Sequence, residues 1–77
     1  MILNEKGMVA LGGMDVKIKE ALQMAIEAEE NARDRYKDLA RQAEDPESRL
    51  LFEQLAREEE SHYKRLSDRL KAIKLLG

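Results

Sequence analysis

The sequence has no cysteine and no tryptophan, a single proline, and only 4% aromatic residues. The absence of cysteine excludes disulfides, thiolate zinc sites and iron–sulfur clusters, and it fits a reducing compartment such as the cytoplasm. So few aromatic side chains leave no platform for stacking nucleic-acid bases. No apolar run approaches the roughly 20 residues that a membrane-spanning helix needs. We therefore expect a cytoplasmic protein that binds neither nucleic acid nor a membrane.

Charged residues make up 39% of the 77 residues, yet the net charge is only −2 because acids and bases are interleaved. A pattern of this kind is typical of a solvated helix surface, and it lacks the basic block of a nucleic-acid-binding protein. A chain of this length forms at most one small domain with a modest core. Such domains often depend on oligomerisation or on a metal for stability.

Two long segments rich in good helix formers are separated by one break. Residues 15–44 contain neither glycine nor proline, so we expect one helix there, with Asp15 as its N-cap. Asp45-Pro46 ends that helix and starts a second one over 46–75, because proline suits the first helical position but disfavours helical geometry in the residue before it. So short a connection predicts an all-α antiparallel two-helix hairpin over residues 15–77.

Residues 1–14 differ from the rest of the chain. They hold three of the four glycines and only two charged residues, Glu5 and Lys6. This N-terminal tail has neither the charged start nor the cleavage site of a secretory signal. We expect it to pack on the helical body, with docking on a neighbouring chain as the alternative.

Ionisable residues interrupt the apolar face of each expected helix. In the second helix Glu59 and His62 occur within a face formed by Leu51, Phe52, Leu55, Leu66, Leu70 and Ile73. In the first helix Glu29 occurs within a face formed by Leu22, Ala25, Ile26, Ala32, Tyr36, Leu39, Ala40 and Ala43. A bare charge in a core is destabilising unless it is paired or bound to metal. We therefore predict that Glu29, Glu59 and His62 are metal ligands.

The hairpin brings these three residues to the same height. Glu29 lies 16 residues before the tip residue Asp45, whereas Glu59 and His62 lie 14 and 17 residues after it. At about 1.5 Å per residue, all three are roughly 21 to 26 Å from the tip. Glu59 and His62 are also three residues apart, so they are neighbours on one helix face and can share one ion. Their neighbours Glu58 and Glu60 are expected in solvent, and Met24 in the core.

A two-helix hairpin cannot cover its own apolar faces, whereas two hairpins can do so by forming a four-helix bundle. A two-fold axis would then assemble four carboxylates and two imidazoles. Ferritin-like di-iron proteins use that ligand set, with one Glu from each of two helices and a Glu-x-x-His pair from each of the others. We therefore expect dimerisation into a ferritin-like four-helix bundle with two iron ions per dimer. Mn(II) or Zn(II) are possible substitutes, since they accept similar ligands.

Two segments resemble the rubrerythrin-type ferritin-like proteins. Residues 28–36, Ala-Glu-Glu-Asn-Ala-Arg-Asp-Arg-Tyr, are similar to the first-helix motif of that family. Residues 56–66, Ala-Arg-Glu-Glu-Glu-Ser-His-Tyr-Lys-Arg-Leu, are similar to its Glu-x-x-His helix. The resemblance implies that Glu29, Glu59 and His62 bind iron. It also implies that Tyr36, two turns beyond Glu29 on the same face, supports a ligand carboxylate.

Rubrerythrins usually carry four helices in one chain, and a chain with two is more similar to the half-size encapsulated ferritins. That resemblance implies a ferroxidase, which oxidises Fe(II) with dioxygen for iron storage or detoxification. It also implies a homo-oligomer up to a decameric ring, held as cargo in an encapsulin nanocompartment. The sequence ends at Lys74-Leu75-Leu76-Gly77 without an extension of the shell-targeting kind, so the expected contact with a shell is through residues 1–14 or a longer native chain. Two alternatives stay open, a rubrerythrin-like peroxide reductase and a non-catalytic helical oligomerisation module.

Overall fold

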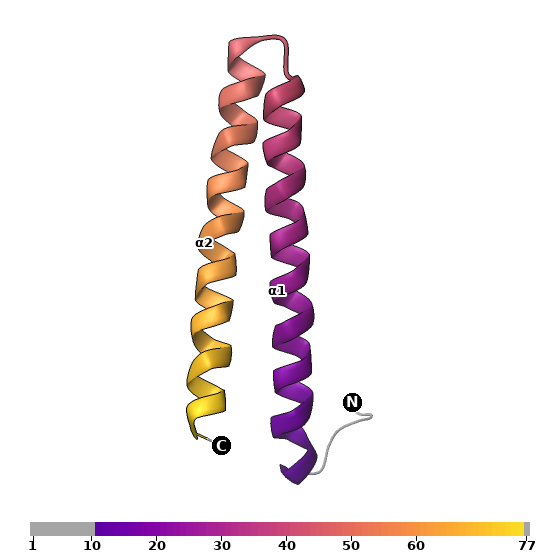
Figure 1. Cartoon of the computed structure of the whole chain (residues 1–77), viewed down its shortest axis with the longest axis vertical. Helices are drawn as coiled ribbons and strands as arrows, with labels where there is room; N and C mark the ends of the chain where they lie inside the picture. The colour runs from indigo at the N-terminus through magenta and orange to yellow at the C-terminus, as the bar shows by residue number, and fades with distance from the viewer. Residues whose placement is uncertain (1–10, 77) are drawn as a thin grey trace.

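The computed structural model describes residues 11–76 as two antiparallel helices, α1 (Leu11–Gln42) and α2 (Pro46–Leu76) (Figure 1). No strand occurs within this range. The prediction of an all-α helical hairpin is therefore confirmed, and the second helix begins at the predicted residue. The expected packing or docking role of the tail, residues 1–14, stays a prediction, because residues 1–10 lie outside the described residues.

The first helix starts earlier than the sequence predicted. It begins at Leu11, four residues before the expected N-cap Asp15, so Gly12 and Gly13 belong to the helix. A glycine inside a helix costs only about 1 kcal/mol relative to alanine, so a pair of glycines weakens a helical turn without preventing it. The helix therefore includes residues 11–14, which had been assigned to the tail.

The tip of the hairpin is held by hydrogen bonds around Asp45. Its Oδ2 atom accepts a hydrogen bond of 2.8 Å from the backbone N–H of Ser48, as expected of the N-cap of α2. This bond is the main reason that the pKa of the Asp45 carboxyl is lowered. From the other direction, the Arg49 side chain donates to the carbonyl oxygen of Ala43 over 3.1 Å, so the end of α1 is tied to the first turn of α2.

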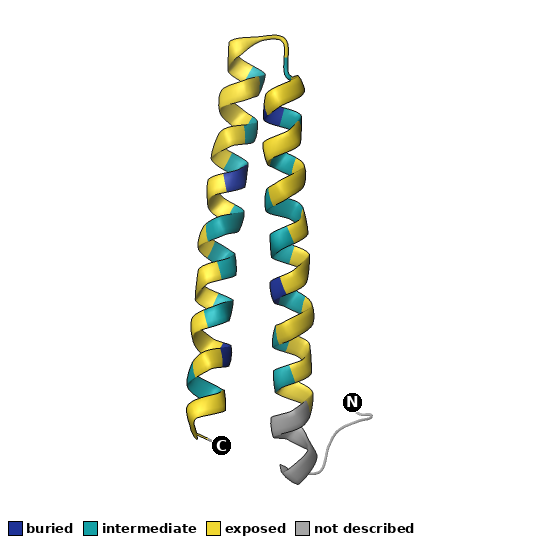
Figure 2. Ribbon diagram, in the orientation of Figure 1, coloured by how far each residue is buried: buried dark blue, intermediate teal, exposed yellow. Residues whose placement is uncertain are grey.

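The buried residues lie between the two helices and are few (Figure 2). Four apolar residues are buried, namely Ile26, Ala40, Ala56 and Leu70, and no large side chain of the described residues is completely covered. The molecule measures 52 × 29 × 13 Å, so it is one helix thick. A stable domain needs two packed layers, and a single hairpin has only one.

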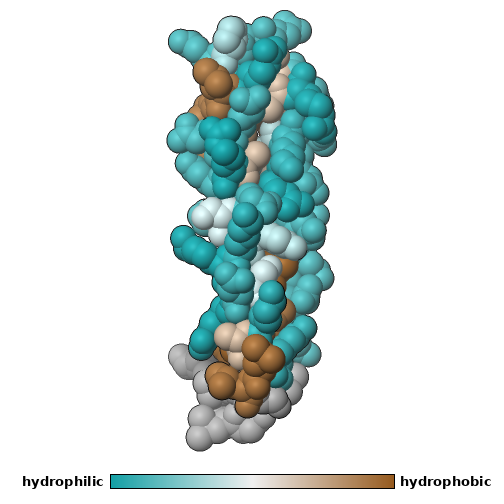
Figure 3. Space-filling view, turned by 60° about the vertical axis from the view of Figure 1, so that its left-hand side comes forward, coloured by the Kyte–Doolittle hydropathy of each residue, from teal (hydrophilic) through white to brown (hydrophobic). Residues whose placement is uncertain are grey.

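Several large apolar side chains remain exposed. Met24, expected in the core, is 70% exposed, because it lies about 200° around α1 from buried Ile26. The others with substantial exposure are Ile18, Leu50, Leu51, Leu75 and Leu76. On the face drawn in Figure 3, hydrophobic surface gathers towards each end of the hairpin and hydrophilic surface lies between. On this face, the apolar surface at the two ends is available for packing against another chain.

Candidate metal centre

The hairpin brings Glu29 of α1 together with Glu59 and His62 of α2. Each offers one ligand atom, and these atoms all lie within 4.8 Å of one another. His62 Nδ1 is 3.1 Å from Glu59 Oε1 and 3.6 Å from Glu29 Oε1. Among the described residues, this is the one group of three or more His, Cys, Asp or Glu side chains close enough to hold a metal ion.

The three side chains are partly covered. Glu59 is 21% exposed, Glu29 27% and His62 44%. They are open to one side of the hairpin, where Glu29 and His62 line a shallow hollow with Arg65 and Leu66. One hairpin supplies three donors, fewer than the six that Fe(II) or Mn(II) commonly takes, so positions are left for water or for a second chain.

The two carboxyl groups affect each other's protonation. A hydrogen bond with Glu59 is the largest reason that the pKa of Glu29 is raised above its ordinary value of 4.5, and burial adds to the shift. The same hydrogen bond, together with one from His62, lowers the pKa of Glu59. The opposite shifts show that the two carboxyl groups interact closely. A divalent cation can neutralise two adjacent carboxylates and also accept an imidazole nitrogen, so this donor set fits a metal such as iron.

Tyr36 lies on α1 between Glu29 and the hairpin tip. Its ring stacks on Phe52 of α2, with centroids 6.4 Å apart and planes inclined by 21°. Tyr36 is seven residues from Glu29, which is about 10 Å along the helix. No hydrogen bond joins its hydroxyl to the three clustered residues within the described hairpin. Its support of a ligand carboxylate stays a prediction.

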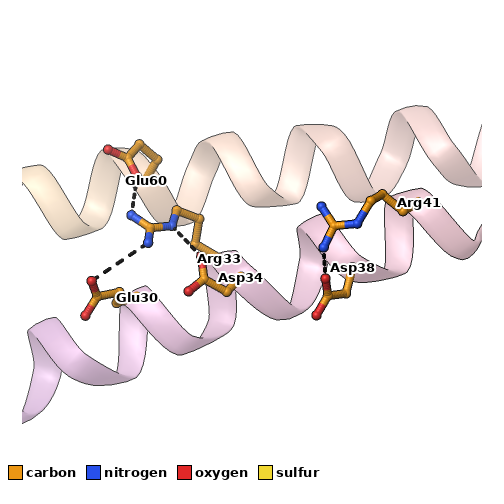
Figure 4. Close-up of polar contacts among 6 residues, drawn as sticks. All are labelled: Glu30, Arg33, Asp34, Asp38, Arg41 and Glu60. Atoms are coloured by element: carbon orange, nitrogen blue, oxygen red, sulfur yellow. Dashed lines mark hydrogen bonds and ion pairs between the residues drawn. The ribbon is translucent and has the colours of Figure 1, made fainter.

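Arg33 forms a polar network beside the cluster that sequence reasoning missed (Figure 4). Its Nη1 donates to Glu60 Oε1 over 2.7 Å, and its Nε donates to Asp34 Oδ1 over 3.0 Å. The guanidinium carbon lies 5.4 Å from the centroid of the Tyr63 ring. Glu60 is thus an ion-pair partner, which corrects the expectation that it is simply solvated. Arg33 lies 12 residues before Asp45 and Glu60 lies 15 residues after it, so their heights make them candidates for a pair, but height alone does not show that they face each other.

A helical hairpin with one glutamate on α1 and a Glu-x-x-His pair on α2 is half of the ferritin-like di-iron architecture. The rubrerythrin family model matches residues 20–75. The chain belongs to the rubrerythrin family, and this membership implies a di-iron protein.

A curated relative is similar to most of the chain, as the family model is. An uncharacterized protein of Archaeoglobus fulgidus is 43% identical over 58 residues, which cover 75% of this chain and 90% of the relative. No solved structure is significantly similar to the chain. Within residues 11–76, neither helix is apolar enough to cross a membrane. These comparisons establish the family and do not distinguish the half-size encapsulated ferritins within it.

Proposed function

We propose that two hairpins pair into a four-helix bundle that binds two iron ions at its centre and oxidises Fe(II). The convergence of Glu29, Glu59 and His62 on one open side of the hairpin carries this proposal. Three acid and imidazole groups at mid-length of a helix pair have no role in packing a core, whereas a di-iron site needs that ligand set from each half.

The two sides of the hairpin differ in the way that pairing requires. The side with Glu29 also carries apolar residues seven apart on α1, namely Ile18, Ala25, Ala32 and Leu39. On α2 the matching apolar residues are Leu55, Leu66 and Ile73. The opposite side has a groove lined by five basic residues, which are Arg33, Lys37, Arg41, Arg49 and Arg57. A partner hairpin therefore fits the side with the candidate ligands, where it covers apolar surface and contributes a second ligand set.

The residues of each hairpin have separate tasks in this proposal. Glu29 and Glu59 bind through oxygen, and His62 binds through Nδ1, the ring nitrogen that faces the two carboxylates. A cation at this site would compete with protons for the Glu29 and Glu59 oxygens, because the ligand form of a carboxyl group is deprotonated. When bound, two Fe(II) ions supply one electron each to dioxygen, which takes up two protons to become hydrogen peroxide and leaves two Fe(III).

The proposal is tested by metal content and mass of the purified protein. After removal of metal and anaerobic addition of Fe(II), we expect two irons per dimer and oxidation on exposure to air. Glu59→Ala and His62→Ala should abolish both, whereas Glu58→Ala should not, since Glu58 is exposed. Unchanged iron binding and oxidation in the first two variants would refute the di-iron site. A dimer that forms without metal and binds no added Fe(II) would instead support the non-catalytic oligomerisation module.

Membership in the rubrerythrin family also favours a second activity, reduction of peroxide by the same site. The two activities are separated by mixing the Fe(II)-loaded protein with dioxygen or with hydrogen peroxide. Faster oxidation by peroxide would assign the peroxide reductase, and faster oxidation by dioxygen the ferroxidase.

The assembly has its own tests. Solution mass distinguishes a dimer from the decameric ring of the half-size encapsulated ferritins. Co-purification with an encapsulin shell from cells producing both proteins would support cargo function in the cytoplasm. Absence of the chain from purified shells would exclude that function.

A further inference from the structure

Arg33 is unusually well covered for a charged side chain of this hairpin. It is 16% exposed, which is less than any of the three clustered side chains. It lies on α1 four residues after Glu29, so it stands one turn closer to the tip. A charge held at this depth needs several partners, and Arg33 has them on both helices.

The partners of Arg33 on α2 are the residues that follow the two candidate ligands. Glu60, which accepts the 2.7 Å bond from Arg33, comes directly after Glu59. Tyr63, whose ring lies 5.4 Å from the guanidinium carbon, comes directly after His62. Adjacent residues on a helix are fixed relative to each other, at about 100° and 1.5 Å. Holding Glu60 and Tyr63 therefore sets the rotation and height of Glu59 and His62.

The remaining contacts of Arg33 hold its own guanidinium group in place. Nε donates to Asp34 over 3.0 Å, and Nη2 lies 3.8 Å from a carboxylate oxygen of Glu30 (Figure 4). Both acidic residues are on α1, so contacts within this helix orient the guanidinium group of Arg33 towards α2. Of the ion pairs between described residues, Arg33–Glu60 is the one that joins α1 to α2 outside the cluster.

The Arg33 network and the cluster act on opposite sides of the hairpin. Arg33 and Glu60 line the groove on one side, whereas Glu29 and His62 line the hollow on the other. Between them, the two like-charged carboxylates Glu29 and Glu59 face each other across the helices and favour separation when no cation is present. The Arg33–Glu60 ion pair lies one turn away, so it opposes this separation of the helices without entering the candidate metal site.

We propose that Arg33 is a positioning residue that locks α2 against α1 through Glu60 and Tyr63 and thereby sets the metal affinity of Glu29, Glu59 and His62. This inference rests on the proposed metal-binding function. The guanidinium group is required because it combines a planar fork of donors with a stacking face, and the ammonium group of lysine offers only a point charge. Residues that orient metal ligands typically contribute about 10- to 100-fold in affinity.

The test compares Arg33→Met, Arg33→Lys and a control, Arg41→Met, in the full chain. Arg41 is 70% exposed and pairs with Asp38 along α1 alone. Calorimetric titration with Mn(II), at a temperature where each variant is folded, gives the dissociation constant. We expect at least about 10-fold weaker binding for Arg33→Met, an intermediate loss for Arg33→Lys, and less than about 2-fold change for Arg41→Met. The absorption spectrum of bound Co(II) should change for Arg33→Met, less for Arg33→Lys and not for Arg41→Met, because it reports ligand geometry.

A merely structural role is excluded by the combination of readouts. If Arg33→Met lowers the melting temperature but binds Mn(II) and Co(II) as the unmodified protein does, the positioning role is overturned while the metal site stands. If the unmodified protein binds no metal, the proposed function fails and this inference fails with it.

Milder variants keep the inference testable if Arg33→Met does not fold. Glu60→Gln removes the charge of the acceptor, and Tyr63→Leu removes the stacking face. Each should weaken Mn(II) binding, and the two together should weaken it by less than the product of the single effects, because both act through Arg33. Unchanged affinity in both single variants would overturn the positioning role.

Discussion

Replacing Glu59 by glutamine should stabilise the metal-free protein and remove most of the stabilisation that a bound metal provides. Glutamine has the same shape and can still hydrogen-bond to Glu29 and His62, so the substitution mainly removes one negative charge. The ligand atoms of Glu29 and Glu59 lie within 4.8 Å of each other. At that separation, two unit charges repel by about 0.9 kcal/mol in a water-like dielectric. The hydrogen bonds that lower the pKa of Glu59 offset part of this repulsion, so the gain should stay below about 0.9 kcal/mol.

With metal present, the order of stability should reverse. A ligand at 100 times its dissociation constant stabilises the folded protein by about 2.7 kcal/mol. For a domain of this size, that is a rise in melting temperature of more than about 10 °C. Loss of one of the three donors of each hairpin should weaken binding about 100-fold or more. At the same metal concentration, the variant then gains only about 0.4 kcal/mol.

Thermal unfolding followed by circular dichroism measures both effects, with and without Mn(II), at constant protein concentration because the melting of an oligomer depends on it. Glu58→Gln is the matched control, since Glu58 is exposed and its neighbour in sequence carries the predicted metal contact. The control should melt as the unmodified protein does under both conditions. An equal metal-induced rise in the Glu59→Gln variant would refute Glu59 as a ligand. A lower melting temperature of that variant without metal would refute the repulsion.

Three further outcomes follow from named residues. Because the pKa of Glu29 is raised above 4.5, metal binding should weaken as the pH falls towards that pKa; calorimetric titration with Mn(II) at several pH values measures the loss, and an affinity that does not change with pH would contradict the raised pKa. The pKa of Asp45 is lowered by its capping bond to Ser48, so the ionised carboxylate stabilises the fold. This contribution is fully present at pH values above the ordinary pKa of 3.8, and it is lost as the pH falls through the lowered pKa. Asp45→Ala should therefore melt lower at neutral pH, and the difference should vanish in acid; a constant difference would contradict this. Ile26 is 8% exposed and Met24 70%, so denaturant titration should show a loss of about 2 to 4 kcal/mol for Ile26→Ala and less than about 0.5 kcal/mol for Met24→Ala.

The sequence errors arose where local rules compete with packing. Asp15 was predicted to cap the first helix, but α1 begins at Leu11 and includes Gly12 and Gly13 because the cost of glycine in a helix is small. Met24 was assigned to the core from its chemistry, yet it lies on the far side of α1 from Ile26. Hydrophobic character alone does not place a residue inside, whereas its angular position on the helix does.

The sequence by itself determined the hairpin and the height of the candidate ligands. Asp45 and Pro46 end one helix and start the next through local sterics and capping, so the tip and the antiparallel direction needed no tertiary information. A constant helical rise then places Glu29, Glu59 and His62 at one level. Only the tertiary structure decided the Arg33 network, because Arg33 and Glu60 are 27 residues apart and their contact depends on how the two helices are rotated against each other. That rotation results from packing of side chains between the helices, which periodicity along one chain segment does not specify.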